Sequence, residues 1–276
     1  MIIDFRSRPP LKEYGTFFVK DRLKLSAHKK ETLVPESYLQ DSVEMWIKEM
    51  DEAGISISVI TGRNIPFCQV PNDLLAKFQK EHEGRVIALA GIDPSGSLHD
   101  PVKEVERSIK ELGLKGVNID PGLCGGEGLY PDDKRVYPIY EKCNELNVPV
   151  LIMTGPYSGK NFSYGHPMHF DNICRDFPQL RVIAGHGCFP YITEAVAAGF
   201  KHQNLFISPD VYMFFPGNDH YVSAINSILR DQMLFASAFP FRAFKETVDD
   251  TMKLGIKEEV LDKYLYKNAQ RALGLV

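Results

Sequence analysis

The stretch Val182-Ile183-Ala184-Gly185-His186 is an apolar run of strand length that ends in a titratable side chain. Its apolar residues follow one another without the polar alternation of a strand that has one face in water. Unbroken apolar strands of this kind are typical of parallel sheets whose two faces are both covered by helices. The sequence therefore predicts a buried parallel strand with His186 at its carboxyl end.

Seven further runs of similar length lie along the chain, and amphipathic stretches of helical period separate them. The strand candidates are residues 2–6, 56–61, 86–92, 116–119, 149–153, 182–185, 205–208 and 233–237. The helix candidates between them are residues 38–53, 72–81, 101–112, 134–146, 168–177, 191–200, 220–229 and 244–254. A last helix, residues 257–273, closes the chain.

Eight strand–helix units in 276 residues predict one α/β domain, residues 1–276, folded as a (β/α)8 TIM barrel with an extra C-terminal helix. The alternative is a doubly wound open sheet. Such a sheet normally carries a glycine-rich phosphate loop after its first strand, and Arg-Ser-Arg-Pro-Pro at residues 6–10 is not one. We therefore favour the barrel, whose active site lies at the carboxyl ends of the strands.

Composition narrows the class of protein. A hydrophobic content of 44%, a charged content of 25% and a net charge of −4 fit a globular protein and argue against a nucleic-acid partner. We interpret the basic residues between Lys20 and Lys30 as a solvated loop or face. The sequence has neither a membrane-spanning run nor a secretory signal. Five cysteines without a C-x-x-C pair indicate a cytoplasmic protein.

The first strand candidate carries an unusual number of charges, because it runs from apolar residues directly into Arg-x-Arg. Alternate side chains of a strand share a face, so we expect Asp4, Arg6 and Arg8 to point one way. Phe5 and Ser7 are then expected to point the other way. A guanidinium group cannot bind a cation but matches the geometry of a carboxylate. The chemistry of this strand is therefore predicted to be directed at an anion.

Short motifs in the second half resemble those of the amidohydrolase-related family, which includes metal-dependent hydrolases and decarboxylases. Residues 176–190 read DFPQLRVIAGHGCFP and resemble the family's FP-x-L and H-G-x-F-P segments. Residues 234–240, LFASAFP, resemble its G-S-D-x-P segment, and residues 267–271, KNAQR, resemble its terminal N-A-x-R-L helix. The order and spacing of these motifs extend the resemblance over nearly the whole chain, and the resemblance implies a TIM barrel.

The metal ligands of the family do not follow. In the family the first strand ends in two zinc-binding histidines, and those positions are Arg6 and Arg8 here. The ligand histidine of the fifth strand falls on Met153, and the aspartate of the eighth falls on Ala238. His186 keeps the family residue. A catalytic zinc ion needs at least three protein ligands, so we interpret the metal as absent and expect no cofactor.

The resemblance implies that His186 handles protons, and imidazole can act as base or acid near neutral pH without a metal. Asp210, after the seventh strand, is expected to orient His186 or to act as a base itself. These two form the predicted catalytic pair. The predicted substrate-binding residues are those that follow the other strands: Arg6, Arg8, Arg63, Asn64, Asp120 and Tyr212.

Each role has a structural alternative. His186 could be a hydrogen-bonded remnant of the family site, and Asp210 could cap a loop or helix. The three arginines could form a salt-bridge network, because like charges packed together need carboxylates or a bound anion to offset them. The candidate carboxylates are Asp4, Asp93, Asp120 and Asp210.

Three functions stay open. The first is a metal-independent enzyme, a homodimer or higher homo-oligomer, acting on a small anionic substrate. Its reaction would be hydrolysis of a lactone, an ester or a C–N bond, or carboxyl loss, with an arginine stabilising the oxyanion. The second is a non-catalytic anion-binding protein on a degenerate barrel. The third is a hydrolase with a relocated metal near His166 and His169. The sequence does not identify the substrate.

Overall fold

Seven parallel strands form one sheet in chain order in the computed structural model, which describes residues 1–15, 24 and 32–276. Apart from Lys24, the basic run between Lys20 and Lys30 lies outside the described residues. The strands are β1 (Ile3–Ser7), β2 (Ile57–Thr61), β5 (Val86–Ile92), β6 (Val117–Ile119), β7 (Val150–Met153), β8 (Val182–Gly185) and β9 (Leu205–Ser208). A short antiparallel hairpin, β3 (Asn64–Ile65) and β4 (Cys68–Gln69), follows β2 and was not predicted.

The predicted eighth strand, residues 233–237, is not a regular strand, yet its backbone closes the barrel. Met233 forms an isolated parallel bridge with Ile207 of β9. The amide of Leu234 donates to the carbonyl of Ile207, and the amide of Phe5 donates to the carbonyl of Phe235, both at 2.9 Å. The segment therefore joins β9 to β1, and the barrel is confirmed over the open sheet.

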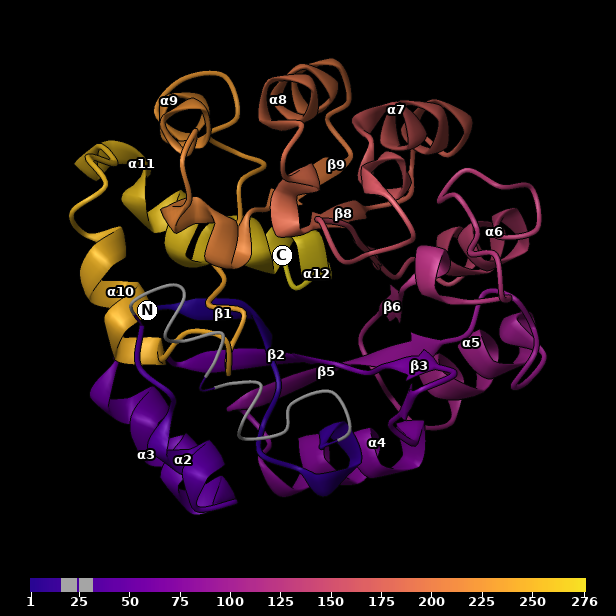
Figure 1. The fold of residues 1–276 in the computed structure, drawn as a ribbon, viewed down its shortest axis with the longest axis horizontal. Helices are drawn as coiled ribbons and strands as arrows, with labels where there is room; N and C mark the ends of the chain where they lie inside the picture. Colours follow the sequence, from indigo (N-terminus) through magenta and orange to yellow (C-terminus); the bar gives the residue numbers. More distant parts are fainter. Residues whose placement is uncertain (16–23, 25–31) are drawn as a thin grey trace.

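Helices surround the sheet (Figure 1) and cover its outer face. They are α2 (Glu36–Leu39), α3 (Val43–Glu52), α4 (Asn72–Glu81), α5 (Pro101–Lys110), α6 (Tyr137–Glu145), α7 (Pro167–Asp176), α8 (Ile192–Lys201), α9 (Asp219–Ile225), α10 (Phe244–Thr251), α11 (Glu258–Asp262) and α12 (Asn268–Leu273), with a π-helical turn, Lys263–Lys267, between the last two. The predicted helix 38–53 is two helices, because Asp41 adopts a φ of 51° and Ser42 starts α3 by accepting a hydrogen bond from the amide of Met45.

Short 3-10 turns follow several strands on the side where a barrel places its active site. They are η2 (Pro121–Leu123), η3 (Phe162–Gly165), η4 (His186–Cys188) and η5 (Asp210–Phe214), while η1 (Lys12–Tyr14) follows β1. None of the helices among the described residues has both the length and the apolar character that a membrane span requires.

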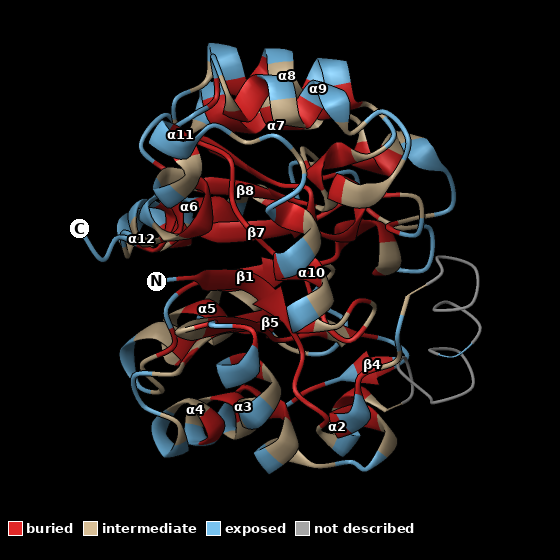
Figure 2. Cartoon of the chain, turned by 90° about the vertical axis from the view of Figure 1, so that its left-hand side faces the viewer, coloured by how far each residue is buried: buried red, intermediate tan, exposed pale blue. Residues whose placement is uncertain are grey.

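Two layers of apolar side chains make up the core, and Figure 2 shows the sheet buried between its covering elements. One layer fills the barrel interior, where Phe5, Val59 and Leu151 pack together. The other lies between sheet and helices and includes Ile60 and Ile152. Neighbours in sequence thus face opposite layers, as the pleat of a strand requires.

A β-bulge interrupts this alternation in β1. Asp4 pairs with Ser58, but Ser7 pairs with Ile60, so β1 contains one more residue than β2 over this interval. Phe5 lies in the interior layer, whereas Asp4 accepts hydrogen bonds from the amide and hydroxyl of Ser237 at 2.8 and 2.7 Å. The predicted strict alternation, with Asp4 on the face of Arg6 and Arg8, is therefore wrong, because a bulge shifts the register by one residue.

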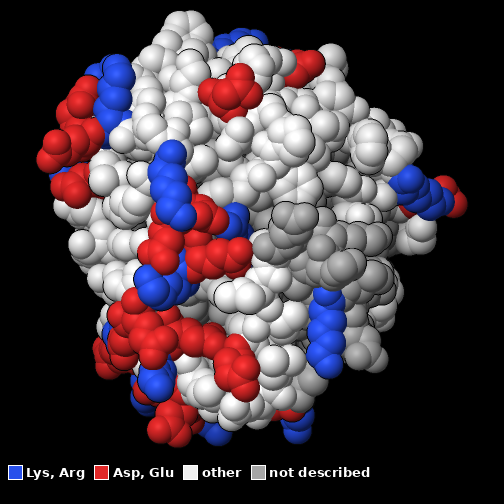
Figure 3. Space-filling model, turned by 60° about the vertical axis from the view of Figure 1, so that its left-hand side comes forward, with Lys and Arg blue, Asp and Glu red and all other residues white. Residues whose placement is uncertain are grey.

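On the face over α3 and α10, acidic and basic side chains alternate without forming a single basic patch (Figure 3). Several of them pair within one helix, such as Lys48 with Glu52 at 3.7 Å and Lys245 with Asp249 at 2.9 Å. Exposed pairs of this kind contribute little to stability.

Candidate active site

The carboxyl ends of β1, β8 and β9 bring Arg6, His186 and Asp210 together. Oδ2 of Asp210 accepts a hydrogen bond from Nη1 of Arg6 at 3.0 Å and another from the backbone amide of His186 at 3.2 Å. Nδ1 of His186 also lies 3.2 Å from this oxygen, but without the angle of a hydrogen bond. Oδ1 of Asp210 accepts from the hydroxyl of Ser208. The predicted catalytic pair is therefore adjacent, and Asp210 links it to Arg6.

Burial sets the protonation of this pair. It lowers the pKa of His186 well below 6.5, and the positive charges of Arg6, Arg8 and Arg63 lower it further. Burial raises the pKa of Asp210, whereas Arg6 and the hydroxyl of Ser208 oppose that rise. The side chain of His186 is 16% exposed and that of Asp210 is not exposed at all. His186 is thus a neutral imidazole at neutral pH, reachable by a ligand and able to accept a proton.

Left-handed backbone is concentrated at these strand ends. His186 and Cys188 both have a φ of 64°, Asp210 a φ of 57° and Ala238 a φ of 59°. Each such residue other than glycine costs about 1–3 kcal/mol and persists only where its surroundings hold it, often at a functional site. No feature of the sequence predicted this backbone strain.

Arg63 and Asp120 form a buried pair with two hydrogen bonds. Nε and Nη2 of Arg63 donate to the two carboxylate oxygens of Asp120 at 3.2 and 2.6 Å. The amide nitrogen of Asn118 supports Asp120 at 3.4 Å. Asn64 lies nearby in the chain but donates its side-chain amide to the carbonyl of Gly91 at 2.7 Å. Asp120 and Asn64 thus have structural partners in addition to their predicted binding role.

Arg6 is bound differently. Its Nη1 donates to Asp210, and neither Nε nor Nη2 makes a hydrogen bond within the described part of the chain. Nε and Nη2 together form the edge of a guanidinium group that holds a carboxylate with two parallel bonds. Arg6 is only 2% exposed, so such a contact would form in a nearly dry environment.

The three predicted arginines converge. Arg8 is completely buried, and burial lowers its pKa to about 9, with a further contribution from the charges of Arg6 and Arg63. Of the four candidate carboxylates, Asp210 and Asp120 pair with arginines. Asp93 instead accepts from the amide and hydroxyl of Ser95 and shapes its own loop.

Tyr212 places an apolar aromatic ring beside His186. Its ring stacks on Phe189 at 4.6 Å between centroids and makes a T-shaped contact with the His186 ring at 5.2 Å between centroids. Burial raises the pKa of Tyr212 to about 12, so the phenol stays neutral. Tyr212 also packs with Val211 and Ala238 in a small apolar cluster.

The residues at the family's metal positions do not fit a zinc ion. Ala238 is completely buried in the apolar cluster, and Met153 packs in the barrel interior. Arg6 and Arg8 add positive charge where ligands would have to bind a cation. Residues 1–15, 24 and 32–276 contain no group of three or more His, Cys, Asp or Glu side chains arranged to hold a metal.

The suggested replacement site is not assembled either. Nδ1 of His166 accepts from the amide of Met168 at 3.2 Å and caps α7. His169 contacts Asp132 through Nδ1 at 2.7 Å and the carbonyl of Ser163 through Nε2 at 2.9 Å. The two histidines thus have separate partners within the described residues.

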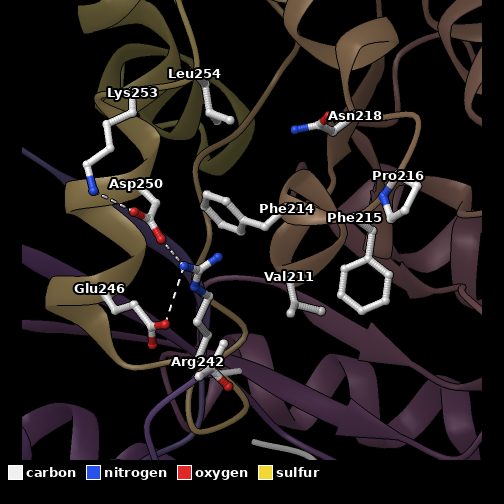
Figure 4. A pocket seen from close by; sticks show the side chains of 11 residues that line it. Val211, Phe214, Phe215, Pro216, Asn218, Arg242, Glu246, Asp250, Lys253 and Leu254 are labelled. Atoms are coloured by element: carbon white, nitrogen blue, oxygen red, sulfur yellow. Dashed lines mark hydrogen bonds and ion pairs between the residues drawn. The ribbon is translucent and has the colours of Figure 1, made fainter. Parts of the chain in front are cut away.

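A cavity of about 630 Å³ lies between η5 and α10 (Figure 4), and Val211 of the apolar cluster around Tyr212 is one of its lining residues. Arg242 stands over the ring of Phe214 at 3.8 Å and pairs with Glu246 at 3.5 Å and with Asp250. None of Arg6, Arg8, Arg63 and His186 lines the cavity. The convergent polar groups lie at the strand ends rather than in this cavity, and such groups mark the strand ends as the candidate site.

Comparison with known proteins gives a family and a matching fold. A family model described as "Amidohydrolase" matches residues 53–275. A 2-keto-4-carboxy-3-hexenedioate hydratase of Sphingobium sp. is 30% identical over 142 residues, which cover 45% of this chain and 41% of the hydratase. A 2-amino-3-carboxymuconate-6-semialdehyde decarboxylase of Dictyostelium discoideum is 26% identical over 186 residues, 56% of this chain and 51% of the decarboxylase. The chain spans about half the length of these relatives or less.

The solved structure of an uncharacterized TIM-barrel protein from Bordetella bronchiseptica matches with a TM-score of 0.91 and 32% identity, over 99% of this chain and 98% of that one.

Proposed function

The chain belongs to the amidohydrolase family, and from this premise we propose that it is an enzyme acting on a small substrate that carries a carboxylate. The reaction would be a lactone- or ester-type hydrolysis or a decarboxylation. The two relatives described above are named for carboxylated compounds, a hexenedioate and a muconate semialdehyde, which supports this class of substrate.

One observation carries the proposal. Arg6 and His186 both lie within hydrogen-bonding distance of the same oxygen of Asp210, and Arg6 keeps one guanidinium edge without a partner among the described residues. A carboxylate held by that edge would be next to a neutral imidazole. The anion and the base therefore act on neighbouring atoms of one small molecule.

In hydrolysis, His186 would take a proton from water as the water oxygen bonds to the carbonyl carbon. The negative charge that develops on the carbonyl oxygen would be stabilised by the arginine cluster. When the carbon–oxygen bond to the leaving group breaks, the leaving alkoxide takes the proton back from the imidazolium. Asp210 would stabilise that imidazolium from 3.2 Å without itself taking a proton.

In decarboxylation the same groups would act in another order. The carbon–carbon bond breaks and its electron pair remains on the substrate carbon, while carbon dioxide leaves. His186 would then pass a proton taken from water to that carbon, and the hydroxide left from the water would combine with the carbon dioxide as bicarbonate. Since burial lowers the pKa of His186, its imidazolium is a strong acid once formed.

We propose that this chemistry proceeds without a metal. Arg6, Arg8, Met153 and Ala238 stand at the family's ligand positions, and none of them is a metal ligand that fits zinc. A guanidinium group supplies a fixed positive charge that needs no ligands. The proposed homo-oligomer and cytoplasmic location stay predictions, and light scattering of the purified protein checks the first.

An assay with matched variants tests the proposal. Lactones, esters and unsaturated or aromatic carboxylic acids are screened for acid release and carbon dioxide release, with wild-type protein and with His186→Asn. Turnover by the wild type that falls at least about a hundredfold in the variant supports the enzyme. Carboxylates that bind wild type and variant equally, without turnover by either, would favour the non-catalytic anion-binding protein.

A further inference from the structure

The turn that carries His186 has an unfavourable backbone. His186, Gly187 and Cys188 follow one another with φ values of 64°, 60° and 64°. Left-handed residues usually occur singly, and a side chain beyond the α-carbon disfavours them. Two of the three residues here have such a side chain. The turn therefore needs partners that hold it in place.

Thr154, directly after β7, contacts both ends of this turn. Its hydroxyl donates to the carbonyl of Gly185 and accepts from the amide of Cys188 at 2.9 Å. Its own amide donates to the same carbonyl of Gly185 at 3.1 Å. Thr154 is 2% exposed, so water does not replace these contacts. One buried hydroxyl thus closes the turn around His186.

The residue after Thr154 supports the imidazole itself. Gly155 has a φ of 93°, and a β-carbon built at this position would lie 3.2 Å from Cβ and 3.4 Å from Cδ2 of His186. The ring of His186 therefore packs closely against the backbone of residue 155. The ring also makes a T-shaped contact with Tyr212, with 5.2 Å between the ring centroids.

We propose that Thr154 is a positioning residue whose hydroxyl holds the His186 imidazole against Asp210 and toward the carboxylate edge of Arg6. The inference rests on the proposed function for its catalytic consequence, but the position of the ring is a separate, measurable property. Without the hydroxyl, the amide of Cys188 would be buried without an acceptor, and the turn would relax toward negative φ. The ring would then leave Asp210.

A matched pair of variants separates the hydroxyl from the shape of the side chain. Thr154→Val keeps the branched shape and removes the hydroxyl, whereas Thr154→Ser keeps the hydroxyl. Nitrogen and carbon NMR signals of the histidine rings are recorded for the full-length protein across pH, and the His186 signals are identified by their loss in His186→Asn. We expect Thr154→Val to move the His186 signals and its titration midpoint, and Thr154→Ser to restore both.

Turnover supplies a second readout once a substrate is found. Thr154→Val should lower kcat about tenfold and leave KM within about twofold, because the arginines that hold the carboxylate are untouched. A folded Thr154→Val variant with wild-type His186 signals would overturn the proposal. If Thr154→Val does not fold, Thr154→Ala takes its place. If neither Thr154→Val nor Thr154→Ala folds, Thr154→Ser decides. Because this variant retains the hydroxyl, displaced His186 signals in it would also overturn the proposal.

A failure of the Thr154 proposal can be told apart from a failure of the proposed function. If His186→Asn keeps full turnover, His186 is not the base and the proposed function fails. The NMR comparison of Thr154→Val with Thr154→Ser still decides whether Thr154 positions the ring. Tyr221→Phe is a useful control, because Tyr221 donates to the carbonyl of Gly187 in the same turn at 2.8 Å and makes no hydrogen bond to Gly185 or Cys188 within the described residues.

Discussion

Arg63 directs both donors of one guanidinium edge at the carboxylate of Asp120, at 3.2 and 2.6 Å. Arg6 directs only Nη1 at Asp210 and keeps the equivalent edge without a partner within the described residues. We propose that these two arginines, both predicted from the sequence to bind substrate, have different tasks. The pair of Arg63 with Asp120 would hold two strand ends together, and Arg6 would hold a ligand.

Arg6→Met should weaken the binding of carboxylates about tenfold to a hundredfold, because a charge-assisted contact contributes about 1.5–3 kcal/mol. Methionine removes the charge and keeps much of the volume. Isothermal titration with the carboxylates found in the substrate screen measures the change. We expect Arg8→Met to weaken binding as well, through loss of positive potential.

Arg63→Met is the matched control. It leaves Asp120 buried without its charged partner, which typically costs about 3–5 kcal/mol. Its melting temperature should fall further than that of Arg6→Met, because Asp120 loses two hydrogen bonds, whereas Asp210 loses one and keeps those from Ser208 and the amide of His186. If Arg6→Met unfolds and retains no binding-competent state while Arg63→Met is stable, the division of tasks is wrong.

His186→Asn should lower turnover about a hundredfold or more and leave the fold intact, since asparagine can hydrogen-bond but cannot accept a proton near neutral pH. The acid limb of kcat/KM in the wild type should lie below pH 6.5, because burial and then the charge of Arg6 lower the pKa of His186. Arg6→Met should move this limb to higher pH. An acid limb that stays in place would remove His186 from the pH dependence.

The purified protein should contain no stoichiometric zinc at the family position, and a chelator should leave its turnover unchanged. The reason is the replacement of ligands by Arg6, Arg8, Met153 and Ala238, two of which are cations. Elemental analysis before and after dialysis against chelator checks both statements. Near-stoichiometric zinc that leaves together with activity would contradict them.

Asp4→Asn should change how stability depends on pH. Burial raises the pKa of Asp4 to about 7, whereas an aspartate in an unfolded chain titrates near about 3.9. Between these values the folded protein holds a proton that the unfolded chain has lost, so the stability contributed by Asp4 falls as the pH rises. The free energy of unfolding of the wild type should decline relative to Asp4→Asn by up to about 1.4 kcal/mol per pH unit from about pH 4 to 7. Denaturant titrations that stay parallel over this range would show that Asp4 does not carry the proton.

The sequence by itself determined the barrel and the location of its polar residues. Unbroken apolar runs such as residues 86–92 and 182–185 identify buried parallel strands, because their composition is set by burial on both faces. Once the strands are known, the residues that follow them lie at one end of the barrel by topology alone. His186, Asp210 and the three arginines were found in this way.

Only the tertiary structure decided the hydrogen-bond and ion-pair partner of each of these residues. The bulge in β1 puts the side chains of Asp4 and Arg6 on different faces of the strand, and no pattern of side chains signals an extra residue in a strand. The pairing of Arg6 with Asp210 and of Arg63 with Asp120 spans 204 and 57 positions of the chain. The hydroxyl of Thr154 holds a turn 34 positions away. Such contacts depend on how strands that are distant in the sequence are placed beside one another in the closed barrel, and periodicity along one strand carries no information about that placement.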